Sequence, residues 1–264
     1  RNKPLGAGVD LFVLARRTPG FTGADLANVI NEAALMCGRR HGNTIEMSDV
    51  NEAVDRVMAG PERKSRIMSD REKSITAYHE GGHALVGHLT PDADPIHKVS
   101  IVARGRALGW TLALPVEDRQ SHSRNELLGR IAMLMGGRTA EELVFGEITT
   151  GAYDDIEQAT RLARKMVTEF GMSDAIGPQR LTAATDEPYL GRDGTRAEMS
   201  NQVAAVVDAE IKRILDEAHE RARVILTEHR STLDLLAARL IERETLDEDQ
   251  LGDVFAQVAG SSDE

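Results

Sequence analysis

The chain is poor in several residue types, and each shortage excludes a class of protein. A single cysteine, Cys37, rules out a disulfide within the chain and suits a reducing compartment. Aromatic residues make up only 3% of the sequence, so the core must rely on Ala, Val, Leu, Ile and Met, which favours helices. No apolar run approaches the roughly 18–20 residues that span a bilayer, and no signal peptide is recognisable.

Positive charge is outnumbered: the chain has 32 Lys and Arg against 43 Asp and Glu. The formal net charge is −11, which argues against nucleic acid as a partner and makes a nucleic-acid-binding helical protein a weak alternative. With 264 residues, the chain has room for one large domain or two smaller ones. It opens with Arg1 rather than methionine, in what reads as a connecting segment, so we expect a soluble fragment of a longer protein.

The most specific motif that the sequence does contain is the pentapeptide 79–83, His-Glu-Gly-Gly-His, a match to H-E-x-x-H. Residues four apart lie on one face of a helix, so His79 and His83 can present two imidazole nitrogens to one metal ion. Glu80 lies beside them, where its carboxylate can take a proton from metal-bound water. The competing interpretation is a buried helix with two hydrogen-bonded core histidines.

The context of the pentapeptide supports a functional interpretation. Residues 69–89 predict one helix, with Ser69 and Glu72 as a capping box at its start. Gly81 and Gly82 each cost a helix about 1 kcal/mol relative to alanine, so their presence indicates that a backbone or a substrate comes close there.

The remaining pattern predicts a mainly α fold with a small β-hairpin. A strand, a turn and a second strand are expected within 97–115, and irregular structure over 171–197. The apolar stripe of 198–228 is most simply core, with a coiled-coil partner as the alternative. The expected caps are Thr22, Ser48, Ser123 and Thr245, and Gly136-Gly137 is expected to interrupt a helix. The helices are expected at 9–16, 23–40, 49–58, 69–89, 124–135, 138–145, 154–170, 198–228, around 233–241 and towards 258.

Composition breaks divide the chain. Residues 1–60 read as a small helical bundle, and Gly60-Pro61 ends the pattern. Residues 61–68 read as a charged linker, 69–258 as a second domain, and 259–264 as a disordered tail.

A catalytic zinc site normally has three protein ligands and a water, so one ligand remains to be found. His88 lies ~180° around the helix from His79, and the metzincin spacing would require histidine where Leu89 stands. His97, His122, His219 and His229 lack any local metal-binding context. Four carboxylates remain open as candidates, and spacing alone does not choose among them: Glu141, Glu142, Asp154 and Asp155.

Several motifs in one order resemble the FtsH-type membrane-anchored AAA+ zinc metalloproteases. They are the pentapeptide 79–83, Gly-Gly-Arg-Thr-Ala-Glu-Glu-Leu at 136–143, and Thr-Thr-Gly-Ala-Tyr-Asp-Asp-Ile-Glu-Gln-Ala-Thr at 149–160. Residues 20–28 look like that family's ATPase lid, and 109–115 resemble its active-site β-segment.

The resemblance implies a role for each matching residue. His79 and His83 would be ligands of one Zn²⁺ per chain, and Glu80 the general base. Asp155 would be the third ligand, and Glu141 would orient a ligand histidine. The family usually has Ala where this chain has Gly81, a difference that should loosen the helix and leave the ligands in place.

The resemblance also implies the architecture of a parent protein. Residues 1–60 would be the helical lid of an AAA+ ATPase and 69–258 a mostly helical zinc metalloprotease domain. In the family, two transmembrane helices and a nucleotide-binding subdomain precede the lid. This chain has no G-x-x-x-x-G-K-[ST], the phosphate-binding motif, so ATP and Mg²⁺ would bind only to the parent protein.

The family further implies a homohexamer at the cell membrane, with this part facing the cytoplasm, that degrades unfolded or membrane proteins. An unfolded substrate would add as a strand to the β-segment within 99–114. The alternative is a non-catalytic lid and oligomerisation module with a degenerate metal site.

Overall fold

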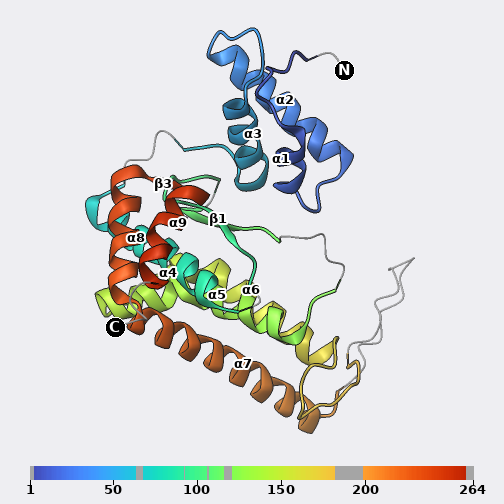
Figure 1. Ribbon diagram of the computed structural model, residues 1–264. Helices are drawn as coiled ribbons and strands as arrows, with labels where there is room; N and C mark the ends of the chain where they lie inside the picture. The colour runs from blue at the N-terminus through green and yellow to red at the C-terminus, as the bar shows by residue number, and fades with distance from the viewer. Residues whose placement is uncertain are drawn as a thin grey trace.

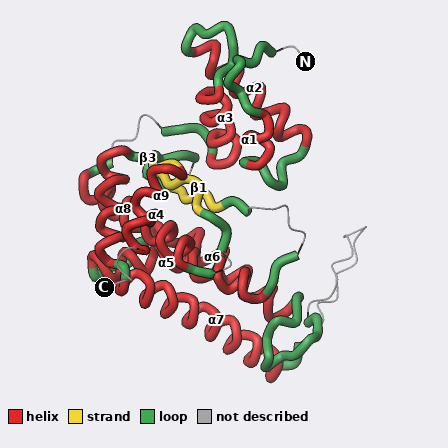
Figure 2. The backbone as a smooth tube through the Cα atoms, in the orientation of Figure 1, coloured by secondary structure: helices red, strands yellow, loops and turns green. Residues whose placement is uncertain are grey.

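The computed structural model describes residues 3–63, 68–91, 93–105, 107–115, 121–181 and 199–259. Helices make up most of these residues, and the strands form one small patch beside them (Figure 2), which confirms the mainly α class. Within these ranges, no helix combines the length and the apolar character that crossing a membrane requires.

The first three helices form a bundle with its own hydrophobic core (Figure 1): α1 (Leu11–Arg16), α2 (Gly23–Arg39) and α3 (Met47–Ala59). Thr22 caps α2 as expected, in a capping box with Asp25. Cys37 is buried in this core. Its other buried members are Leu14, Val29, Ala33, Ile45, Val50, Ala53 and Val54.

The expected start of the third helix was wrong. Helix α3 begins at Met47 with Glu46 as its N-cap, and Ser48 lies inside its first turn. The carboxylate of Asp49 accepts a hydrogen bond from Glu46 N at 2.9 Å and two from Arg40 Nε. This contact with the end of α2 fixes the first turn before Ser48, which a local capping rule does not detect.

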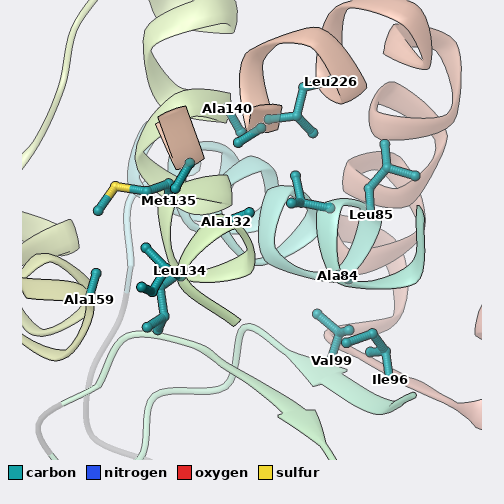
Figure 3. Packing of buried hydrophobic residues seen from close by; sticks show 14 of the residues in the cluster. Ala84, Leu85, Ile96, Val99, Ala132, Leu134, Met135, Ala140, Ala159 and Leu226 are labelled. Carbon is teal, nitrogen blue, oxygen red and sulfur yellow. The ribbon is translucent and has the colours of Figure 1, made fainter. Parts of the chain in front are cut away.

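The larger unit is built around two helices in contact, α4 (Asp70–Leu89) and α5 (Arg124–Phe145). Helices α6 (Tyr153–Thr168) and α7 (Asn201–Glu228) pack against α5, and α8 (Arg230–Arg243) packs against α4. Figure 3 shows Leu85, Ala132 and Leu226 in the core between these helices. The apolar stripe of α7, from Val207 to Leu226, is buried in the same core, so it is not a free coiled-coil face.

Helix α5 is continuous, and the expected interruption at Gly136-Gly137 was wrong. A Cβ built on Gly82 would lie 2.4 Å from the carbonyl oxygen of Gly136, so the backbones of α4 and α5 touch at this point. The packing gained across that contact outweighs the cost of about 1 kcal/mol per glycine in a helix.

The sheet contains three antiparallel strands in the order β2-β1-β3: β1 (Ile96–Ser100), β2 (Trp110–Ala113) and β3 (Thr245–Asp247). The expected strand–turn–strand is present, but the third strand was missed because Thr245 was read as a helix cap. Ser100 Oγ bonds Thr245 Oγ1 at 2.8 Å, and this long-range pairing takes the segment away from α9 (Glu248–Ala259).

The bundle and the larger unit meet between α3 and the sheet. Arg104 forms two hydrogen bonds with Glu52, of 3.1 and 2.9 Å, and Lys98 of β1 pairs with Asp55 of α3. Arg63 N also donates to Ala103 O at 2.9 Å. Residues 64–67 of the predicted linker, 182–197 of the expected irregular segment and 260–264 of the expected tail lie outside the described residues. Ala259, predicted as the first residue of that tail, is the last residue of α9.

Candidate metal centre

The H-E-x-x-H segment lies in the buried middle of α4. His79, Glu80 and His83 are 8%, 6% and 6% exposed, because α5, α8 and the sheet enclose this part of the helix. Ser69 caps the helix by accepting from Glu72 N, as expected. A Cβ on Gly81 would lie 3.4 Å from Leu233 Cδ1, an ordinary contact, so the structure has room for an alanine at this position.

Three side-chain atoms from two helices form a small triangle. His79 Nε2 lies 3.0 Å from His83 Nε2 and 3.2 Å from Asp155 Oδ2. His83 Nε2 lies 3.4 Å from the same carboxylate oxygen. A tetrahedral zinc ion with bonds of 2.0–2.1 Å holds its ligand atoms about 3.3 Å apart, so the two imidazoles and the carboxylate fit this metal in type and spacing.

The second nitrogen of each histidine is occupied. Glu141 Oε1 lies 2.6 Å from His79 Nδ1, and Met133 O lies 2.8 Å from His83 Nδ1. Both partners accept hydrogen bonds, so a proton on each Nδ1 would leave the lone pair of each Nε2 for a metal. Glu141 is itself held by Thr149 N, which donates to its Oε2 at 2.7 Å.

The electrostatics of the cluster favour a positive charge at its centre. Burial opposes protonation of His79, but hydrogen bonds to Asp155 and Glu141 outweigh it and raise the pKa of His79 to about 10. Burial also opposes ionisation of Asp155, yet hydrogen bonds from both histidines hold the pKa of Asp155 well below its usual range. A divalent cation can supply the charge that a histidine proton otherwise supplies.

Comparison with known proteins agrees with this geometry. Residues 66–254 match peptidase family M41, and residues 8–52 match the AAA+ lid domain. The chain belongs to peptidase family M41.

Its relatives carry the name "ATP-dependent zinc metalloprotease FtsH". FtsH 3 of Symbiobacterium thermophilum is 54% identical over 260 residues, which are 98% of this chain and 42% of that protein. FtsH of Rubrobacter xylanophilus is 52% identical over 252 residues, 95% of this chain and 39% of that protein. The Mycobacterium tuberculosis protein is 52% identical over 259 residues, 98% of this chain and 34% of that protein. This M41 chain therefore spans about two fifths or less of the relatives it matches.

A glycine leaves space beside the two Nε2 atoms of the candidate metal site in this M41 chain. A Cβ on Gly137 would lie 2.5 Å from Nε2 of both His79 and His83, where an ion must be able to approach. Helix propensity predicts Gly137 only as a helix break and gives no sign of this close approach. The one available signal was a second glycine pair inside a helical pattern, like Gly81-Gly82.

Glu80 has a partner that sequence reasoning also missed. Thr111 of β2 donates from Oγ1 to Glu80 Oε2 at 2.8 Å. The resemblance placed residues 109–115 in an active-site β-segment but gave Thr111 no role. Nothing in the local sequence pattern connects a strand threonine to a helix glutamate 31 positions earlier.

The other candidate ligands lie outside the cluster. Asp154 is exposed, and Glu142 lies 3.4 Å from His219 Nε2 rather than near the triangle. His88 stacks on Phe255 with ring centroids 3.9 Å apart, and His97 pairs with Glu248 at 2.9 Å. His122 and His229 are not in the described group of three residues that could hold a metal. Of the four open carboxylates, the structure thus brings Asp155 and Glu141 to the histidines.

Proposed function

We propose that this chain is the peptidase part of an ATP-dependent zinc metalloprotease, with His79, His83 and Asp155 as the ligands of one Zn²⁺. The triangle formed by the two Nε2 atoms and Asp155 Oδ2, with sides of 3.0–3.4 Å, carries this proposal. When bound, zinc acts as a Lewis acid on the scissile carbonyl and makes water acidic enough to attack near neutral pH.

Glu80 supplies the proton transfer. It lies next to His79 on α4 and is almost fully buried. Burial raises the pKa of Glu80 above its ordinary value, which strengthens it as a base towards the attacking water. The carboxylate accepts that water's proton and passes it to the leaving amine. Glu141 orients His79 for metal binding through its bond to Nδ1.

The sheet offers a way to bind an extended substrate. Strand β2 is at one edge of the described sheet, because β1 lies between β2 and β3. An unfolded polypeptide adds to such an edge by main-chain hydrogen bonds, which read little of its sequence. Thr111 of β2 contacts Glu80, so a substrate on this strand would lie close to the base. This arrangement suits an enzyme that degrades many unfolded or membrane proteins.

The parent protein would supply the ATPase subdomain and the membrane anchor. We infer that residues 1–60 are the lid of an AAA+ ATPase, 61–68 a linker and 69–258 the protease domain. The lid match and the relatives' printed names support this division. ATP and Mg²⁺ would bind a subdomain outside this chain, which lacks the phosphate-binding motif. A homohexamer anchored in the cell membrane, with this part in the cytoplasm, completes the proposal.

The test is cleavage of an unstructured fluorogenic peptide by the purified chain as isolated, after chelation, and after zinc is added back. Activity that is lost and restored supports the zinc peptidase. Glu80→Gln is the matched control, because it keeps the size of the side chain and should keep the zinc but lose cleavage. An active Glu80→Gln enzyme rejects Glu80 as the base. Zinc-independent assembly without any cleavage favours the non-catalytic module.

A further inference from the structure

We propose that Thr111 is a positioning residue: its hydroxyl orients the carboxylate of Glu80 towards the attacking water. The proposal rests on the zinc peptidase function above. The observation behind it is the hydrogen bond from Thr111 Oγ1 to Glu80 Oε2, 2.8 Å long, across the interface between β2 and α4. A hydroxyl bound to one carboxylate oxygen fixes the direction in which the other oxygen points. Hydrogen bonds to an ionised acceptor are among the stronger ones in proteins.

The backbone before Thr111 is shaped around the same side chain. A Cβ built on Gly109 would lie 2.7 Å from both Cγ and Oε1 of Glu80, and 2.8 Å from Ser100 O. Any other residue at this position would collide with the carboxylate. The backbone therefore approaches Glu80 closely at Gly109, just before β2, and Thr111 hydrogen-bonds its carboxylate two residues later.

The strand that carries the hydroxyl is itself fixed by its neighbours. Thr111 is opposite Val99 of β1, and Val99 is in turn opposite Leu246 of β3. Val99 and Leu246 are buried in the main core. The position of the hydroxyl is thus set by the central strand of the sheet, and a rigid support of this kind keeps a reacting group in productive geometry.

A positioning role makes a specific kinetic prediction. Loss of the hydroxyl leaves Glu80 present but free to turn, so the proton transfer slows while substrate binding and zinc binding persist. Thr111→Val is the sharpest variant, because it keeps the shape and the strand preference of threonine and removes only the hydroxyl. Thr111→Ser restores the hydroxyl on a smaller side chain.

The experiment measures kcat and KM for the fluorogenic peptide, together with the zinc content of each variant. We expect Thr111→Val to lower kcat about 10- to 100-fold, the effect of one lost hydrogen bond to a charged group, with KM unchanged. Thr111→Ser should recover most of kcat. The single tryptophan, Trp110, is the neighbour of Thr111, so its unchanged fluorescence shows that β2 is intact in each variant.

A second readout needs no turnover. A peptide hydroxamate chelates zinc and gives its proton to the neighbouring carboxylate, so its affinity reports where the Glu80 carboxylate points. Calorimetry should show weaker hydroxamate binding to Thr111→Val and nearly normal binding to Thr111→Ser. If the zinc-loaded wild-type chain cleaves nothing, the peptidase function fails on its own, and the hydroxamate series still tests the contact.

Three results would overturn the proposal. Equal kcat and equal hydroxamate affinity in wild type and Thr111→Val would show that the hydroxyl does not position Glu80. A raised KM with unchanged kcat would assign Thr111 to substrate docking instead. Failure of Thr111→Ser to recover either readout, with Trp110 fluorescence and zinc content normal, would show that the methyl group and not the hydroxyl matters.

Discussion

Glu141 Oε1 lies 2.6 Å from Nδ1 of His79, on the opposite side of the ring from Asp155, whose Oδ2 lies 3.2 Å from Nε2. One imidazole is therefore held between two carboxylates from different helices, α5 and α6. Glu141 fixes the tautomer of the ring, and Asp155 lies beside Nε2, the nitrogen that would bind the metal.

Removing the outer carboxylate should weaken zinc binding without abolishing it. We expect Glu141→Ala to lower zinc affinity about 10- to 100-fold, the range for partners of ligand histidines. Competition with a chromogenic chelator measures this affinity. Glu142→Ala is the matched control, since Glu142 is the next residue and is about half exposed beside His219. An equal loss in both variants would contradict the role of Glu141.

Replacing the inner carboxylate should have a larger effect. Asp155→Asn removes a charged oxygen from the triangle, so we expect zinc affinity to fall more than about 100-fold, beyond the loss caused by an outer partner. Metal analysis of the dialysed protein, together with peptide cleavage, measures the effect. Asp154→Asn changes the exposed neighbour and should behave as wild type. A zinc-loaded, active Asp155→Asn chain would exclude Asp155 as a ligand.

Two glycine-to-alanine changes should have opposite effects. At Gly137 the new Cβ would lie 2.5 Å from both Nε2 atoms, so we expect Gly137→Ala to lose zinc while the helix stays folded. At Gly81 the new Cβ would meet Leu233 at 3.4 Å, so Gly81→Ala should keep zinc and gain up to about 1 kcal/mol of stability. Zinc content and thermal unfolding are measured for both. Normal zinc binding by Gly137→Ala would show that the ion lies elsewhere.

The bundle formed by α1, α2 and α3 should lose stability in acid through one buried carboxylate, Asp49. The hydrogen bond from Arg40 holds the pKa of Asp49 below its ordinary value of 3.8. A lowered folded-state pKa stabilises the fold above the ordinary pKa, and this contribution is lost as pH falls below 3.8 through the folded value. The protection factors of the α3 amides, which are corrected for the intrinsic exchange rate at each pH, should therefore fall below about pH 4 in the wild type.

Asp49→Asn tests this assignment. The variant lacks the titrating group. The free energy of opening of α3 at neutral pH, measured by hydrogen exchange, should therefore be lower by about 1–3 kcal/mol and should depend less on acid. Asp174→Asn is the control, because Asp174 is a carboxylate with a side chain 89% exposed. An unchanged acid response in Asp49→Asn would assign the pH dependence to another group.

The sequence predicts the parts of the site that a single helix determines. The spacing of His79 and His83 places both rings on one face of α4, and the structure has them 3.0 Å apart at Nε2. The third position depends on how α6 is rotated against α4, and adjacent residues on a helix point about 100° apart. Local spacing therefore left Asp154 and Asp155 open, and only the family resemblance favoured Asp155. Its role as a ligand stays a prediction.

The errors in the fold have the same physical origin. Thr22 and Ser123 cap their helices as predicted, because a capping box needs only residues three apart. Ser48 and Thr245 were assigned caps by the same local rule, but contacts with Arg40 and with β1 decide those segments. Gly136-Gly137 was read from helix propensity alone, which tertiary packing overrides.

The position of β3 near the C-terminal end of the described chain has a consequence for biosynthesis. All the proposed ligands and the base have left the ribosome once Asp155 is clear, but Thr245–Asp247 follows much later. Until then β1 has only β2 as a partner, and a two-stranded hairpin has little stability of its own. α4 also lacks Leu233 and Leu236, which cover Gly81. The site is therefore complete only after α8 and β3 have been synthesised. A chain halted before them has the proposed ligands but no fixed strand to position Glu80.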